Sequence, residues 1–143
     1  MAAPEQALWA KLKRSLPTGV HLTRIENRAG TGCPDVYMAF EGHMFWVELK
    51  VAKGNAIDMR PSQIAWNMAH SAAGGVSFIL VNRPSKGDAF LFEGSQALEL
   101  ADRGVLAAPL WHGLRLADCF EVILAALTMR ALACDSRSEV QDS

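Results

Sequence analysis

The segment DVYMAFEGHMFWVELKV, residues 35–51, decides the fold class of this chain. It contains two runs of strand-forming residues, Asp35 to Phe40 and Met44 to Val51, separated by three residues with a central glycine. Two such runs at this separation are typical of a tight β-hairpin. The segment therefore predicts two antiparallel strands.

The second strand carries charge inside an otherwise apolar run. Only Glu48 and Lys50 are charged within residues 45–51. Because side chains alternate along a strand, these two point to one face, and Val47 and Leu49 point to the other. A strand this apolar is expected to lie in the middle of its sheet, where charges without partners are disfavoured. An ordinary exposed pair at a hairpin end is the alternative.

A second carboxylate lies at the start of the hairpin. If Phe40 pairs with Met44 across the turn, Asp35 lies opposite Leu49, and a bulge or a slip of one residue brings its carboxylate beside that of Glu48. Two carboxylates at such a short distance repel each other, so a pair of this kind usually exists to hold a divalent cation. Hard oxygen ligands favour Mg²⁺ or Mn²⁺.

A lysine beside this pair completes a set suited to phosphodiester hydrolysis. Lys50 follows Glu48 by two residues and shares its face of the strand. Its ammonium group can position an attacking water or stabilise negative charge on a phosphate oxygen. Asp35, Glu48 and Lys50 are therefore the candidate catalytic residues.

The flanking sequence places the hairpin in an α/β domain. Periodicity and turn residues predict helices over 4–16, 61–73, 95–103 and 116–133, and further strands over 20–26, 76–81 and 89–92. The order predicts an αβββαβ core with a mixed sheet of four or five strands, flanked by helices and followed by a C-terminal helix. We expect a single domain over residues 1–134 and a flexible tail over 135–143.

The helix that follows the hairpin has two distinct arcs. One is apolar and is expected to face the sheet; the other is more polar and is expected to face away from it. Gln63, in the first turn, can still overhang the end of the sheet where Lys50 emerges. Trp66 is expected to pack against a neighbouring element rather than to stack on a base. The apolar arc contains Ile64, Ala65, Met68, Ala69 and Ala72, and the polar arc Gln63, Trp66, Asn67 and His70.

Further acids and bases surround the predicted site. Glu5 shares a helical stripe with Leu8 and Leu12 and is a candidate third acid near the metal, although the helix dipole alone also favours an acid in a first turn. Glu26 is a rival for the same role. Four basic residues are candidate contacts to nucleic-acid phosphates, namely Arg24, Arg28, Lys53 and Arg60.

Composition limits the remaining function classes. The net charge of −1 gives no overall attraction to phosphate, but residues 1–90 carry 10 basic and 7 acidic side chains, whereas residues 91–143 carry 4 and 8. The three cysteines and four histidines lack the spacing of a zinc site. No apolar stretch is long enough for a membrane span and the N-terminus lacks the order of a secretion signal, so we expect a cytoplasmic protein.

Three short motifs in this order resemble a known superfamily. Gly32-Cys33-Pro34-Asp35, then Glu48-Leu49-Lys50, then Pro61-Ser62-Gln63 opening a helix, is similar to the PD-(D/E)xK nucleases. The likeness is greatest to their virus-type replication-repair (VRR-NUC) and Holliday-junction-resolvase-like branch, which is common in phage and bacterial genomes, and it covers about residues 5 to 82. It implies that Asp35 and Glu48 bind Mg²⁺, that Lys50 assists the attacking water, that Gln63 supports the site, and that Glu5 completes the metal ligands.

The resemblance also implies a substrate and partners. We expect a structure-selective DNA endonuclease that acts on branched, flap or single-stranded DNA in recombination, repair or replication. Resolvase-like members act as dimers, which implies a homodimer, with replication or recombination proteins as possible further partners. The alternative is a non-catalytic DNA-binding or assembly module that retains the nuclease fold. The intact Asp35, Glu48 and Lys50 set favours the enzyme.

Overall fold

A single mixed sheet organises the protein. The computed structural model describes residues 3–25 and 30–141, and the side chains of 3–25 and 30–137. Within this part of the chain, six strands lie in sequence order, and all neighbours are antiparallel except the parallel pair β3 and β4. The strands are β1 (His21–Arg24), β2 (Val36–Phe40), β3 (His43–Val51), β4 (Ser77–Arg83), β5 (Asp88–Glu93) and β6 (Trp111–Gly113).

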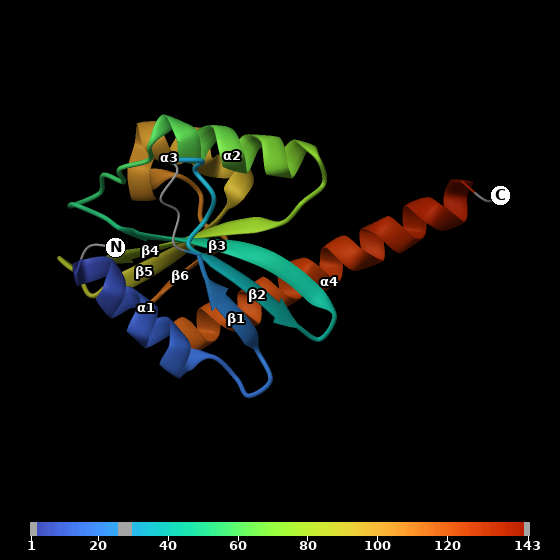
Figure 1. Ribbon diagram of the computed structural model, residues 1–143, viewed down its shortest axis with the longest axis horizontal. Helices are drawn as coiled ribbons and strands as arrows, with labels where there is room; N and C mark the ends of the chain where they lie inside the picture. The colour runs from blue at the N-terminus through green and yellow to red at the C-terminus, as the bar shows by residue number, and fades with distance from the viewer. Residues whose placement is uncertain (1–2, 26–29, 142–143) are drawn as a thin grey trace.

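Helices cover both faces of this sheet (Figure 1). Helices α1 (Ala3–Ser15) and α4 (Leu116–Gln141) lie on one face, and α2 (Pro61–Ala72) and α3 (Ala97–Arg103) lie on the other. Helix α2 is the crossover that a parallel β3 and β4 pair requires. Two short 3₁₀ turns, η1 (Gly94–Gln96) and η2 (Gly104–Leu106), flank α3. The predicted αβββαβ core with a mixed sheet is therefore confirmed, and β6 is a strand too short for its pattern to be recognised.

Two apolar cores fix the sheet between its helices. On the α1 and α4 side, side chains of the sheet pack against Leu8, Leu12 and the buried residues of α4. On the α2 and α3 side, Ile79 and Phe92 pack with Leu100 of α3. The predicted alternation in β3 is confirmed, since Phe45, Val47 and Leu49 all belong to the first core.

The hairpin turn sets the register of β2 on β3. Glu41 and Gly42 form a two-residue turn in which both have positive φ, 49° and 81°, as a type I′ turn requires. Phe40 consequently pairs with His43 rather than with Met44. The register differs by one residue from the pairing assumed in the sequence interpretation, because His43 belongs to the strand and not to the turn.

Helix α4 is longer than the sequence pattern indicates. Its first half is anchored by Phe120, Ile123 and Leu127, whereas residues 128–137 are all exposed. The exposed part projects away from the domain (Figure 1) and continues to Gln141, through residues assigned in the sequence interpretation to a loose tail. This segment contains no glycine or proline, so each added residue extends the helix with one more hydrogen bond. No helix in the described residues is long and apolar enough to cross a membrane.

Candidate active site

Two carboxylates meet where β2 begins and β3 ends. Val36 pairs with Val47, so continuing this antiparallel register by one residue places Asp35 opposite Glu48. The Oδ2 atom of Asp35 accepts a hydrogen bond from the backbone N–H of Leu49 at 2.9 Å. Glu48 is buried, with 2% of its surface exposed. The one-residue slip therefore produces the carboxylate pair.

Gln63 links this pair to the lysine. Its Nε2 donates to Oε1 of Glu48 at 3.0 Å, and its Oε1 accepts from Nζ of Lys50 at 2.7 Å. The same Oε1 also accepts from the backbone N–H of Arg60 at 3.0 Å. Lys50 donates a second hydrogen bond to the carbonyl oxygen of Asp58, at 2.6 Å. A single amide from α2 thus fixes the relative positions of an acid and an ammonium group on β3.

The interpretation of the faces of α2 is wrong. Gln63 and Asn67, assigned to the outer arc, are buried at 4% and 0% exposure, whereas Met68 of the apolar arc is 40% exposed. Burial of Asn67 is possible because its amide is satisfied: Nδ2 donates to the carbonyl of Gln63, and Oδ1 accepts from the hydroxyl of Ser77, both at 2.8 Å. Polar groups with complete hydrogen bonding can face a sheet, so polarity alone misassigned the helix.

The environment of Glu48 disfavours its charged form. Burial is the main cause, and the neighbouring charge of Asp35 adds to it, so that the pKa of Glu48 rises to about 9. The ammonium of Lys50 opposes the shift, while a side-chain contact with Asp35 and the charge of Glu5 reinforce it. The Oε2 atom of Glu48 is buried and has no hydrogen-bond partner among the described residues. An unsatisfied oxygen on a buried acid fits a carboxylate that binds a cation.

This carboxylate pair fits a small divalent cation. Mg²⁺ is usually bound through one or two carboxylates and completes its coordination with waters and substrate phosphates. Asp35 and Glu48 supply two such carboxylates. The described residues contain no group of three or more acids, histidines or cysteines arranged to hold a metal. Glu5 therefore stands close enough to influence the pKa of Glu48 without forming a three-ligand cage with the pair.

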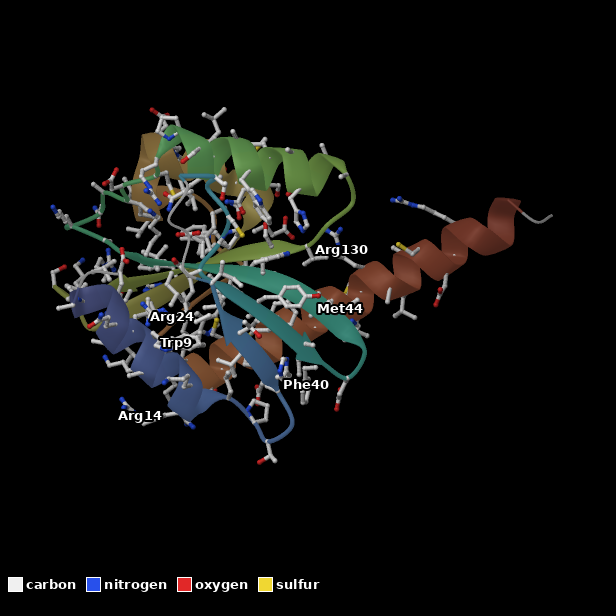
Figure 2. The ribbon with its side chains drawn as sticks, in the orientation of Figure 1. Trp9, Arg14, Arg24, Phe40, Met44 and Arg130 are labelled. Atoms are coloured by element: carbon white, nitrogen blue, oxygen red, sulfur yellow. The ribbon has the colours of Figure 1, made fainter. Side chains whose placement is uncertain are left out.

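The structure separates the candidate phosphate contacts. Lys53 and Arg60 are exposed in the segment between β3 and α2, and Arg60 immediately precedes the helix that carries Gln63. Arg24 pairs with Val36 and shares its side of the sheet, which is the α1 side and not the carboxylate side (Figure 2). Arg28, and Glu26 as the rival third acid, lie outside the described residues.

Two neighbours of the site were not singled out from the sequence. Burial, followed by the charges of Glu48 and Asp35, raises the pKa of the Cys33 thiol, so Cys33 lies within electrostatic reach of the pair. The carbonyl oxygen of Asp58 binds Lys50, although the Asp58 residue is itself exposed. Cys33 was detectable, because it lies two residues before Asp35. A backbone carbonyl leaves no signal in the sequence.

Gly32 controls how closely the loop before β2 approaches α2. It has a positive φ of 77°, and a Cβ atom at this position would lie 1.9 Å from the carbonyl oxygen of Ser62. We expect Gly32→Ala to push the first turn of α2, with Gln63, away from the strand and to lower the free energy of unfolding by about 3 kcal/mol. Gly54→Ala is the matched control, since Gly54 also has positive φ, 60°, but no atom would meet its Cβ within 4 Å. Equal losses in urea unfolding of the two variants would contradict this explanation.

The raised pKa of Glu48 predicts a pH dependence of stability in metal-free protein. The folded protein keeps the Glu48 proton up to about pH 9, whereas the unfolded chain releases it near 4.5. The unfolding free energy should therefore fall as pH rises through this window. Glu48→Gln removes this dependence and should stabilise the protein by about 2 kcal/mol at pH 8. Urea unfolding in EDTA between pH 5.5 and 8.5 tests this, with exposed Glu121→Gln as control; a constant difference between wild type and Glu48→Gln across pH would refute it.

Comparison with known proteins gives structural likenesses but no match to a family model or a curated protein. Among solved structures, it is similar to Hjc, a Holliday junction resolvase from the archaeal hyperthermophile Archaeoglobus fulgidus, with 16% sequence identity and a TM-score of 0.48. The match covers 64% of this chain and 74% of that chain. The chemistry of the site is therefore inferred from its own geometry.

Proposed function

We propose that this protein is a metal-dependent DNA endonuclease of the PD-(D/E)xK type. The observation that carries the proposal is the buried carboxylate of Glu48, which has an unsatisfied oxygen, lies beside Asp35 and is joined through Gln63 to Lys50. Burial of like charges costs stability and needs a function to explain it. A cation-binding pair with an adjacent ammonium is suited to hydrolysis of a phosphodiester.

Each residue of the site has a distinct part in this proposal. Asp35 and Glu48 would hold Mg²⁺ or Mn²⁺, which would supply Lewis-acid activation of the phosphate and of a water molecule. Lys50 uses two of its three N–H groups for Asp58 and Gln63, and directs its remaining donor capacity to the attacking water or a phosphate oxygen. Gln63 is a positioning residue, because it holds Glu48 and Lys50 without itself supplying charge.

The substrate and partners follow from the same proposal. Lys53 is exposed and lies three residues after Lys50 in the sequence. Arg60 is also exposed, and its backbone N–H donates to Gln63, which contacts Lys50. Both would contact phosphates of the bound strand. Arg24 and Arg28 remain candidates for more distant phosphates, and Glu5 for an outer contact to the metal. Selectivity for branched, flap or single-stranded DNA, a homodimer and replication or recombination partners remain predictions, as does membership of the VRR-NUC branch.

A cleavage assay tests the proposed function. Labelled four-way junction, flap, single-stranded and duplex DNA would be incubated with wild-type protein in Mg²⁺, in Mn²⁺ and in EDTA. We expect cutting of at least one substrate that depends on the metal. Binding without cutting under every condition would instead favour the non-catalytic DNA-binding module. Cutting that persists in EDTA would contradict the metal-dependent mechanism.

A further inference from the structure

Four aromatic rings form a continuous strip on the carboxylate side of the sheet. Tyr37 packs on Trp46 with ring centroids 4.8 Å apart, and Trp46 meets the edge of Trp66 at 5.5 Å. Trp66 in turn stacks on His70 at 4.6 Å, so it packs against neighbouring side chains as the sequence predicts while part of its surface stays exposed. All four side chains are only partly buried, so the strip presents aromatic surface to solvent. We call Tyr37, Trp46, Trp66 and His70 the aromatic strip.

The strip begins at the proposed active site. Because residues two apart share a face of a strand, Tyr37 follows Asp35 on β2, and Trp46 precedes Glu48 on β3. Trp66 lies three residues after Gln63, on the adjoining surface of α2. The strip therefore continues directly from each of the three elements that carry the site.

In the part of the chain that the structure describes, the sheet surface on the β1 side of the strip is exposed. Helix α2 packs mainly on η1, α3 and β4, whereas β1 is an edge strand of the sheet. Thr23, which pairs with Tyr37, is exposed, as is His21 in the same strand. Met44, on the same face of β3 as Trp46, is 65% exposed and lies near the tip of the hairpin (Figure 2). An extended chain can reach the rings from this side.

The composition of the strip favours bases over phosphates. It carries no carboxylate and no lysine or arginine, so it offers π surface and little charge for a phosphate. Successive bases of a single strand stack on protein aromatic rings with little dependence on sequence. The bases of a duplex are already stacked and paired, and their faces are not available without unstacking.

We infer that the aromatic strip binds unpaired nucleobases of the strand whose phosphate lies at Asp35 and Glu48. This inference rests on the proposed nuclease function and specifies its substrate: DNA with unpaired nucleotides next to the scissile bond, rather than continuous duplex. Lys50 and the carboxylate pair handle the phosphate, and the strip holds the adjoining bases. The strip thereby selects strands that have lost their pairing.

Binding of normal and abasic oligonucleotides tests the strip without any cleavage. A labelled 12-nucleotide oligothymidylate and an abasic strand of equal length and charge would be titrated with wild-type protein in EDTA at low salt, with anisotropy as the readout. We expect the base-containing strand to bind about tenfold more tightly. Trp66→Leu should reduce this ratio to about threefold or less. Trp9→Leu, on the α1 side of the sheet, should leave the ratio unchanged (Figure 2).

The outcomes separate the strip from the nuclease proposal. Equal affinity of the wild-type protein for the two strands would overturn the proposed role of the strip, whatever the variants do. A ratio that survives in Trp66→Leu, with a native circular dichroism spectrum, also overturns it. Base-dependent binding that Trp66→Leu abolishes supports the strip even if no DNA is cut, in which case only the nuclease proposal fails. If Trp66→Leu does not fold, the wild-type comparison of the two strands still decides.

Discussion

Glu48→Gln is expected to reduce metal-dependent DNA cleavage by about 10³-fold or more, while leaving the protein folded. Glutamine has the same shape and can still accept the hydrogen bond from Nε2 of Gln63. It cannot supply a carboxylate to the cation. Initial rates on the best substrate of the wild type, at saturating Mg²⁺ or Mn²⁺, measure the loss.

This variant combines two effects of opposite sign. The same substitution that removes cleavage should stabilise the metal-free protein between about pH 5 and 9, because Glu48 must take up a proton on folding in this range and glutamine need not. Glu121→Gln, on the exposed surface of α4, controls for loss of a negative charge and should cleave as wild type does. Cleavage by Glu48→Gln within about tenfold of wild type would remove Glu48 from the active site.

Lys50→Met is expected to lower cleavage by about 10²-fold to 10³-fold. Methionine fills a similar volume but lacks the ammonium that would bind the attacking water or a phosphate oxygen. The Lys50 charge also lowers the pKa of Glu48, so its removal should make protons compete more strongly with the cation. The increase from pH 9 to pH 7 in the metal concentration needed for half-maximal rate should therefore be larger for Lys50→Met than for the wild type.

Lys86→Met provides the matched control, because Lys86 is exposed between β4 and β5. It should leave both the rate and the metal requirement unchanged. Lys50→Met also removes one of the two donors to Oε1 of Gln63, and the rate loss could then arise from displacement of Glu48. Recovery of the wild-type metal requirement at high pH, with the rate still low, would identify the lost ammonium as the cause. A normal rate for Lys50→Met would contradict the proposed role.

The polarity of the residues gave a correct prediction of side-chain orientation in β3 and an incorrect one in α2. In β3, strict alternation of apolar and charged residues predicted the orientation of Glu48 and Lys50, because a strand has only two faces. In α2, the same use of polarity placed Asn67 on the arc facing away from the sheet, and it is buried; only the position of Gln63 in the first turn indicated its contact with Lys50. The difference arises because their partners, which include Lys50 and Ser77, come from other elements.

The sequence pattern also could not determine the register of β2 on β3. A three-residue turn and a two-residue turn both fit the segment around Gly42, and they differ by one residue in the partner of every position. The positive φ of Glu41 selects the shorter turn and places Asp35 opposite Glu48. Likewise, the extension of α4 to Gln141 depends on the anchoring of its first half and not on any periodicity in its exposed part.

The sequence by itself determined the class of the fold, the order of its core elements and the shared face of Glu48 and Lys50, since these depend on local periodicity and on the alternation of side chains. Only the tertiary structure decided that Gln63 joins Glu48 to Lys50, that Arg24 lies on the far side of the sheet, and that the aromatic strip continues from the site. These features depend on hydrogen bonds and packing contacts between residues that are far apart in the chain. That pairing is a property of the packed domain and not of any one segment.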